Sequence, residues 1–102
     1  MNVFENESVR QLVDAFMTLE TREECEIFLE DLLTTKEILD AAQRLAVAKL
    51  LEKRAVYNEI SRETGASSAT ISRVNRACLY GPGGYRTVLE RLENRDLDEA
   101  EK

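Results

Sequence analysis

The chain has 102 residues, is 43% hydrophobic and 33% charged, and carries a formal net charge of −6, which is typical of one small globular domain. It contains no histidine, which excludes His-ligated metal sites and catalysis by a Ser-His pair. Cys25 and Cys78 lack the spacing of metal ligands, and each is expected to be a small buried apolar residue of a helix. No enzymatic activity, metal or cofactor is therefore expected.

No segment of the chain predicts insertion in a membrane. The apolar runs are all shorter than the roughly 18 residues that a spanning helix needs. The first residues, from Met1 to Glu7, are polar and acidic rather than basic as in a signal peptide. A soluble, cytoplasmic protein with no membrane partner is expected.

Three helices are predicted in the first half of the chain, each starting at a side chain that can cap a helix. Ser8 and Gln11 have the spacing of a capping box, in which each side chain bonds the backbone of the other residue. Thr21 and Glu24 repeat this spacing at the start of a second helix. Thr35 is expected to cap a third helix that runs to about residue 53.

Apolar residues recur at helical spacing in all three segments, so each helix is expected to bury one face. The predicted inner residues of the first helix are Val9, Leu12, Val13, Phe16 and Leu19. Those of the second are Cys25, Phe28, Leu29, Leu32 and Leu33. Those of the third are Ile38, Leu39, Ala42, Leu45, Ala46 and Leu50.

The second half of the chain predicts two short helices around Gly65 and one last helix. The stretch from Gly81 to Gly84 contains the single proline and three glycines, which interrupt a helix. The last helix is expected over residues 85–95, with Val88, Leu89 and Leu92 on its inner face. The charged tail from residue 96 is expected to fray.

The segment at 57–76, YNEISRETGASSATISRVNR, has the spacing of a helix-turn-helix within residues 56–78. Gly65 is expected at the turn, because a sharp turn between packed helices often needs a positive φ. Ser61 is small, as required where the first helix crosses close to the second. The residues expected to point inward are Ile60, Thr64, Ile71 and Val74.

Charge is unevenly distributed along the chain and favours a nucleic-acid partner for this segment. Residues 1–40 contain 3 basic and 11 acidic residues, whereas residues 53–86 contain 6 basic and 2 acidic residues. No acidic residue lies between Ala66 and Leu89, and the start of the second helix is rich in small hydroxyl side chains that bind phosphates or base edges. The predicted DNA-binding residues are Lys53, Arg54, Ser67, Ser68, Thr70, Ser72, Arg73 and Arg76. Lys53 and Arg54 are expected to contact phosphate, Ser67 to cap the helix, and Arg73 to contact a guanine edge or a phosphate.

About 60 residues, from Leu33-Thr34 to Leu92, resemble the Trp repressor superfamily. The similarity is carried by the segment TGASSATISR at 64–73, by Arg44, and by the ending YGPGGYRTVLERL, which is most similar to the YerC/YecD-type Trp repressor-related proteins. The resemblance implies an all-α homodimer in which the N-terminal helices of residues 1–53 intertwine. It also implies that the two helix-turn-helix units enter successive major grooves of double-stranded DNA.

The same resemblance implies a ligand pocket, but the chain departs from the family pattern there. Arg44 and Arg73 match the two arginines that hold tryptophan, and Thr34 matches a threonine supplied by the second subunit. Ala77 stands where the family has a serine, and Val74 stands where a glycine leaves room for the indole ring. Because a buried zwitterion without its hydrogen bonds is unfavourable, tryptophan is not expected to be a corepressor.

The sequence therefore favours a homodimeric, repressor-like transcriptional regulator that binds specific double-stranded DNA sequences. The alternative is a helical protein-interaction module whose acidic outer helices bind another protein, with the helix pair serving only for packing.

Overall fold

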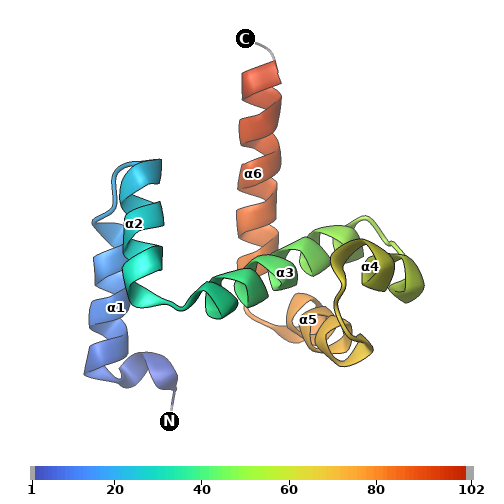
Figure 1. The fold of residues 1–102 in the computed structure, drawn as a ribbon, viewed down its shortest axis with the longest axis horizontal. Helices are drawn as coiled ribbons and strands as arrows, with labels where there is room; N and C mark the ends of the chain where they lie inside the picture. The colour runs from blue at the N-terminus through green and yellow to red at the C-terminus, as the bar shows by residue number, and fades with distance from the viewer. Residues whose placement is uncertain (1, 101–102) are drawn as a thin grey trace. The chain divides into compact units, whose positions relative to one another are not determined.

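Six α-helices joined by short connections make up most of residues 2–100, the residues that the computed structural model describes (Figure 1). The helices are α1 (Glu7–Met17), α2 (Arg22–Leu32), α3 (Thr35–Glu52), α4 (Tyr57–Thr64), α5 (Ser68–Tyr80) and α6 (Gly84–Ala100), with a short 3₁₀ helix, η1 (Val3–Glu5), before α1. The described residues contain no strand, which confirms the predicted all-α class with about six helices. None of the described helices combines the length and apolar character needed to span a membrane.

The N-terminus of α1 is capped by Asn6. Its side chain accepts a hydrogen bond from the backbone N–H of Val9 at 3.2 Å. The predicted capping box of Ser8 and Gln11 is therefore wrong, because Ser8 already lies within the first turn of the helix. Asparagine and serine are equally good caps, so the sequence is compatible with a helix that starts after Asn6 or after Ser8.

The predicted cap of α2 is confirmed. The backbone N–H of Glu24 donates to the Thr21 hydroxyl at 3.1 Å. The Glu24 carboxylate in turn accepts a hydrogen bond from the N–H of Glu20 at 2.9 Å. In a capping box the usual donor is the N–H of the cap residue itself, here Thr21, which is the next residue in the chain.

The cap of α3 is Thr34 and not the predicted Thr35. The N–H of Glu37 donates to Thr34 Oγ1 at 3.1 Å, and the N–H of Thr34 donates to the Glu37 carboxylate at 2.9 Å. Thr34 takes the position because a glutamate follows three residues later, whereas Thr35 is followed by Ile38, which cannot complete the pair.

The chain divides into two compact units, residues 1–38 and 39–102. In the first unit, α1 and α2 contact through Phe16 and Phe28, whose ring centroids lie 5.1 Å apart in an edge-to-face arrangement. No residue of α1 or α2 is buried, and Leu12 and Val13 from the predicted inner face of α1 are 38% and 44% exposed. The apolar faces predicted for these helices are thus present but only partly covered, since Val9, Leu19, Cys25, Phe28, Leu29 and Leu33 are half-buried and none is buried.

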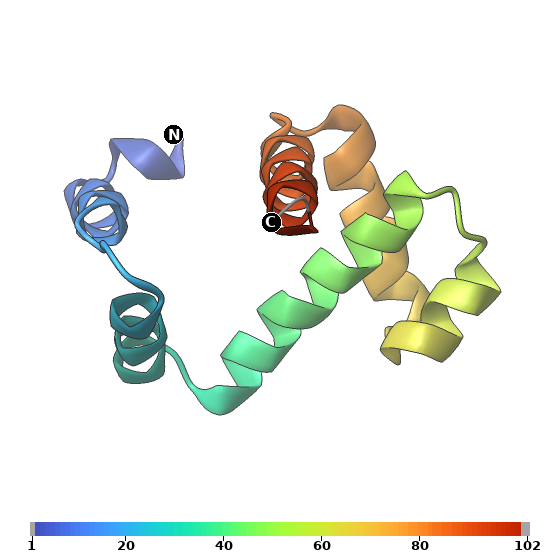
Figure 2. The same ribbon diagram turned by 90° about the horizontal axis from the view of Figure 1, so that it is seen from above.

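The second unit contains the hydrophobic core. Its buried residues are Val47, Ala48, Ile60, Ala66, Ile71, Val74 and Leu89, contributed by α3, α4, the turn after α4, α5 and α6. Half-buried side chains packed against them are Leu45, Leu50, Leu51, Ala55, Cys78 and Tyr85. Figures 1 and 2 show α5 crossing the C-terminal half of α3, with α6 starting next to the end of α5. Both cysteines are free and half-buried, less enclosed than the sequence predicted.

The inner face of α3 agrees only in part with the predicted one: Leu45 and Leu50 pack against the core as predicted. Leu39 is 63% exposed and Ala42 and Ala46 are also exposed, whereas Val47 and Ala48 are fully buried. Alanine, leucine and valine occur all around this helix, so its hydrophobic period does not select one face. The packing of α4 and α5 against α3 selects it instead.

The last helix is longer at both ends than the predicted 85–95. It begins at Gly84, after Gly83 with φ 89°, and continues to Ala100, so the tail expected to fray from residue 96 is helical over its described part. No glycine or proline interrupts residues 85–100, and Arg95 and Glu99 form an i,i+4 ion pair at 4.0 Å. Leu89 is buried, whereas Val88 and Leu92, also predicted to face inward, are 47% and 39% exposed.

Candidate nucleic-acid interface

The turn between α4 and α5 is formed by Gly65, as predicted. Gly65 has φ 73° and ψ 4°, the left-handed conformation, and its N–H donates to the carbonyl oxygen of Ser61 at 2.8 Å. This bond closes the C-terminus of α4, and a side chain at this position would strain the backbone. The glycine therefore ends the first helix and redirects the chain into the second.

Hydroxyl groups complete the hydrogen bonding of this turn. Ser61 Oγ donates to the carbonyl oxygen of Ala66 at 3.0 Å. Thr64 Oγ1 donates to the carbonyl oxygen of Ile60 at 2.7 Å and accepts from the N–H of Ala66 at 3.1 Å. Ser61 was predicted only to be small at the helix crossing; its hydroxyl also bridges the turn. The buried Ala66 was not singled out by the sequence, although its small size suits the position.

A side chain of α3 ties this turn to the rest of the second unit. Gln43 Nε2 donates to the carbonyl oxygen of Thr64 at 3.1 Å. Thr64 is the last residue of α4, so its carbonyl has no partner within the helix, and the amide of Gln43 satisfies it. Sequence reasoning missed Gln43 because the two residues are 21 positions apart and no local pattern links them.

The inward residues of the helix pair pack as predicted. Ile60 of α4 is fully buried, and Ile71 and Val74 of α5 are 1% and 2% exposed. Thr64 is half-buried and hydrogen-bonded within the turn. Since these side chains hold one face of α5 against the core, the opposite face is available to solvent.

The start of α5 is capped by Ser67, as predicted. Its hydroxyl accepts from the N–H of Thr70 and pairs with Thr70 Oγ1, both at 3.1 Å. These bonds occupy the Ser67 hydroxyl within the chain, and Thr70 as a whole is half-buried. The first turn contains no acidic residue, so the partial positive charge of the helix N-terminus is not neutralised there.

The structure places the predicted outward residues of α5 at the surface. Ser68, Ser72, Arg73 and Arg76 are exposed. None of them forms an ion pair or a side-chain hydrogen bond with another described residue. The face therefore presents two hydroxyls and two guanidinium groups to solvent.

Lys53 and Arg54 lie between α3 and α4, and both are exposed. Arg54 has φ 62°, and it is the one non-glycine residue of the described chain in the left-handed region. The N–H of Arg54 donates to the carbonyl of Leu51 at 2.9 Å, and that of Ala55 donates to the carbonyl of Leu50 at 3.1 Å, which closes the C-terminus of α3. Glycine is the usual residue in this conformation, so arginine is held there with backbone strain.

The residues of the predicted ligand pocket have different surroundings. Arg44 is half-buried and Arg73 is exposed, but Val74 is packed in the core at 2% exposure. Ala77 is exposed, and the hydroxyl of Thr34, which belongs to the first unit, accepts the capping bond of α3. Two positions that the family resemblance assigned to a tryptophan site therefore have another role in the described chain. Val74 packs in the core, and the Thr34 hydroxyl caps α3.

Comparisons with known proteins agree with this geometry. The sequence profile of the Trp repressor protein family matches residues 7–93. The chain is 42% identical over 92 residues to the uncharacterized protein YerC of Bacillus subtilis (strain 168), which covers 90% of this chain and 88% of that protein.

Two solved structures are also similar to this chain. A TrpR-like protein from Eubacterium eligens ATCC 27750 has 45% sequence identity and a TM-score of 0.86, covering 91% of this chain and 96% of that one. A protein from Staphylococcus aureus, described as a candidate Trp repressor, has 42% identity and a TM-score of 0.84, covering 91% and 95%. With its helical fold, its glycine-centred helix-turn-helix and these relatives, the chain belongs to the Trp repressor protein family.

Proposed function

We propose that this chain is a homodimeric, repressor-like transcriptional regulator that binds specific sequences of double-stranded DNA. The observation that carries the proposal is the exposed face of α5 after the Gly65 turn, with free hydroxyl and guanidinium groups and no acidic residue from Ala66 to Leu89. Membership of a family named for a repressor supports the same function. Because such a regulator acts on chromosomal DNA, we place it in the cytoplasm.

The proposed contacts follow from the positions of the side chains. Arg73 and Ser68, exposed on the first two turns of α5, would meet base edges or phosphates in the major groove. Lys53 and Arg54 would contact phosphates beside the groove, and Arg76 would add a further phosphate contact. Ser67 would act indirectly: its hydroxyl caps α5, and the capped N-terminus of the helix would face a phosphate.

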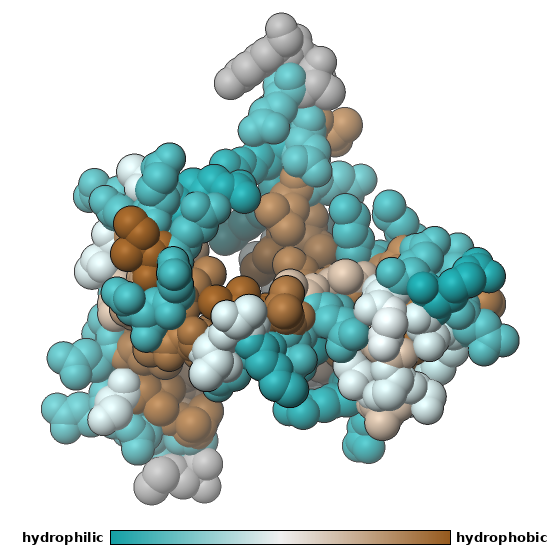
Figure 3. Space-filling model, in the orientation of Figure 1, coloured by the Kyte–Doolittle hydropathy of each residue, from teal (hydrophilic) through white to brown (hydrophobic). Residues whose placement is uncertain are grey.

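Dimerisation is supported by the open apolar faces of the first unit. Hydrophobic side chains gather over α1 and α2 (Figure 3), where Phe16 and Ile27 are 37% and 62% exposed. Covering such surface is a strong driving force for association, and a second copy of the chain offers the matching face. Two-fold symmetry predicts a palindromic operator with half-sites about 34 Å apart. Phe16→Asp should convert the dimer to a monomer in sedimentation equilibrium; a monomeric parent chain would contradict the proposal.

We also propose that tryptophan is not the corepressor of this chain. The isopropyl group of Val74 is packed among core residues, so the space needed by an indole ring beside α5 is filled. Ala77 has no hydroxyl to bind a polar ligand group. Both differences lie on α5, and both disfavour the binding of tryptophan.

The test of DNA binding is selection of bound sequences from a random duplex pool, followed by footprinting. We expect a protected palindrome and an affinity that falls steeply with salt, as release of counterions requires. Arg73→Glu should abolish binding without changing helix content or dimer formation. Arg10→Glu is the matched control, since it makes the same charge change at an exposed site of α1.

Equal affinity for all duplexes, or unchanged binding by the Arg73→Glu variant, would refute the proposed reading face. If the chain binds no duplex but retains a dimer, the protein-interaction module becomes the better function. The 11 acidic residues among residues 1–40 are the feature that favours it.

A further inference from the structure

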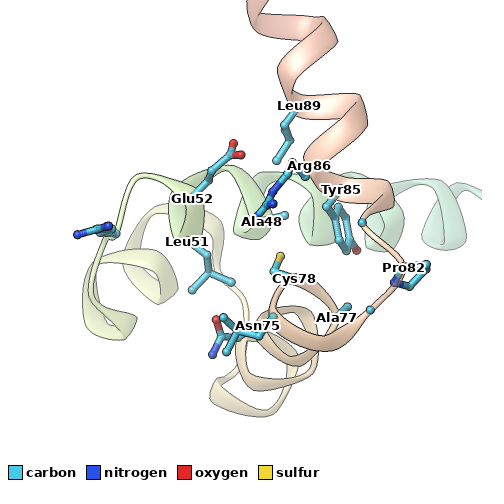
Figure 4. Close-up of a pocket in the computed structure, with 14 residues that line it drawn as sticks. Ala48, Leu51, Glu52, Asn75, Ala77, Cys78, Pro82, Tyr85, Arg86 and Leu89 are labelled. Carbon is cyan, nitrogen blue, oxygen red and sulfur yellow. The ribbon is translucent and has the colours of Figure 1, made fainter.

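A groove of about 430 Å³ lies between the C-terminal end of α3 and the middle of α6, within the second unit. Its apolar part is formed by Leu89, which is buried, and by Leu92, which is 39% exposed. Glu52 of α3 and Leu89 of α6, which both line the groove, lie near each other in Figure 4. The groove is therefore a place where the two helices bring their side chains together.

The other residues of the groove are charged, and both signs are present. Lys49 and Lys53, the groove lysines, are four positions apart at the end of α3 and just after it. Glu93 and Asp96, the groove carboxylates, are three positions apart on α6. Residues at these spacings lie on one side of a helix, so each pair extends along the groove. Glu52 adds a third carboxylate, which gives the groove a net charge of −1.

This arrangement changes the surroundings of Lys53. In the sequence, Lys53 begins a segment, residues 53–86, with 6 basic and 2 acidic residues. Folding brings it into one groove with carboxylates of α6 that lie outside that segment. Among the described residues, neither groove lysine forms an ion pair within 4.0 Å. Each ammonium group is flexible and unpaired, so it can turn either toward the groove carboxylates or toward a phosphate outside.

We propose that the groove carboxylates compete with DNA phosphates for the groove lysines and so restrain the affinity of the chain for DNA. The inference rests on the proposed function and adds a regulating element to its phosphate contacts. The carboxylates attract the ammonium groups in the free chain, and they repel phosphates that approach the same groups. Helix α6 thus sets the strength of phosphate binding beside the helix-turn-helix without contacting a base.

The test uses the full chain and the double variant Glu93→Gln/Asp96→Asn. This variant should bind a duplex of random sequence about threefold more tightly at about 0.1 M salt, where charges up to roughly 10 Å apart still interact. The gain should shrink as salt rises, so that the slope of affinity against salt becomes steeper. Glu90→Gln/Asp98→Asn is the matched control, because it removes the same two charges from exposed residues of α6 that do not line the groove. Its gain should be clearly smaller.

A second set of variants tests whether the effect acts through the lysines. When Lys49→Gln/Lys53→Gln is already present, Glu93→Gln/Asp96→Asn should give no gain beyond that of the control. Equal gains by the two double variants, or a gain that persists without the lysines, would show an effect of net charge alone and overturn the proposal. A change of oligomeric state in sedimentation equilibrium would overturn it as well.

Heparin, a sulfated polyanion, separates this proposal from the proposed function. Glu93→Gln/Asp96→Asn should elute from a heparin column at higher salt than the parent chain and the control variant, and this measurement contains no DNA. If the parent chain binds heparin but no duplex, the proposed function fails while the elution order still decides the competition. Unchanged elution of the variant, or no retention of any variant, would refute the competition.

Discussion

Gln43 of α3 and Thr64 of α4 are joined by a hydrogen bond of 3.1 Å from the Gln43 amide to the Thr64 carbonyl oxygen. This bond ends the helix that precedes the Gly65 turn and fixes the turn to α3. The bond links α3 to the turn that sets the direction of α5. It therefore helps to position the exposed face of α5, although Gln43 itself is not part of that face.

Gln43→Leu should weaken operator binding about fivefold, because the Thr64 carbonyl loses its partner and the turn is less well fixed. The slope of affinity against salt should stay unchanged, as no phosphate contact is removed. Filter-binding titrations over a range of salt concentrations measure both quantities. Gln11→Leu in α1 is the control for the same substitution at an exposed position. A smaller salt slope in the Gln43 variant would show instead that Gln43 contacts DNA.

Arg54→Gly should stabilise the fold and weaken DNA binding at the same time. Glycine adopts φ 62° without the strain that a side chain causes, which favours the folded state. The greater chain entropy of glycine in the unfolded state opposes this effect, so the free energy of unfolding is expected to rise by up to about 1 kcal/mol. Loss of the guanidinium should lower the salt slope by about one for each phosphate contact removed. Urea unfolding and salt-dependent binding measure the two effects. Unchanged DNA affinity would remove Arg54 from the interface.

Gly65→Ala should destabilise the chain by roughly 1–2 kcal/mol, because alanine is strained at φ 73°. The cost comes from the backbone alone, since an added Cβ would meet its nearest neighbour, Gln43 Nε2, at an ordinary 3.9 Å. Gly84→Ala is the control: its φ lies outside the left-handed region and no atom lies within 4 Å of an added Cβ. Chemical unfolding of both variants measures the difference, and equal stabilities would contradict the strain at Gly65.

Cys78 should make the fold less stable in alkaline solution. Its pKa is raised by burial and by Glu52, so the folded chain holds the thiol proton more tightly than the unfolded chain does. The resulting stability is complete below the ordinary value of 9.0 and is lost as pH rises through the higher pKa of the folded state. Cys78→Ala should remove this part of the pH dependence when thermal unfolding is followed between about pH 8 and 11. An identical alkaline loss in both proteins would assign it to other groups.

L-tryptophan should produce no binding heat in calorimetry and no change in operator affinity. Val74 fills the space beside α5, and Ala77 supplies no hydroxyl. Tight binding with a stoichiometry of one tryptophan per chain would show that the core around Val74 opens for the ligand.

Local chemistry in the sequence determined the helix-turn-helix. Gly65 at the turn, Ser67 as the cap of α5, and Ile71 and Val74 three residues apart each depend on neighbours within one or two helical turns. Such signals are readable because the conformation of a short segment is dominated by nearby residues.

Only the tertiary structure decided which face of α3 is buried, which carbonyl Gln43 bonds, and which charged residues share the groove between α3 and α6. Val47 and Ala48 are buried while Leu39 and Ala46 are exposed, although all four are apolar. Because apolar residues occur on every side of α3 among its charged ones, the sequence does not select one buried face until other helices pack against it. The Gln43–Thr64 bond and the groove between α3 and α6 likewise join residues distant in the chain, and no local spacing encodes a contact that exists only after packing.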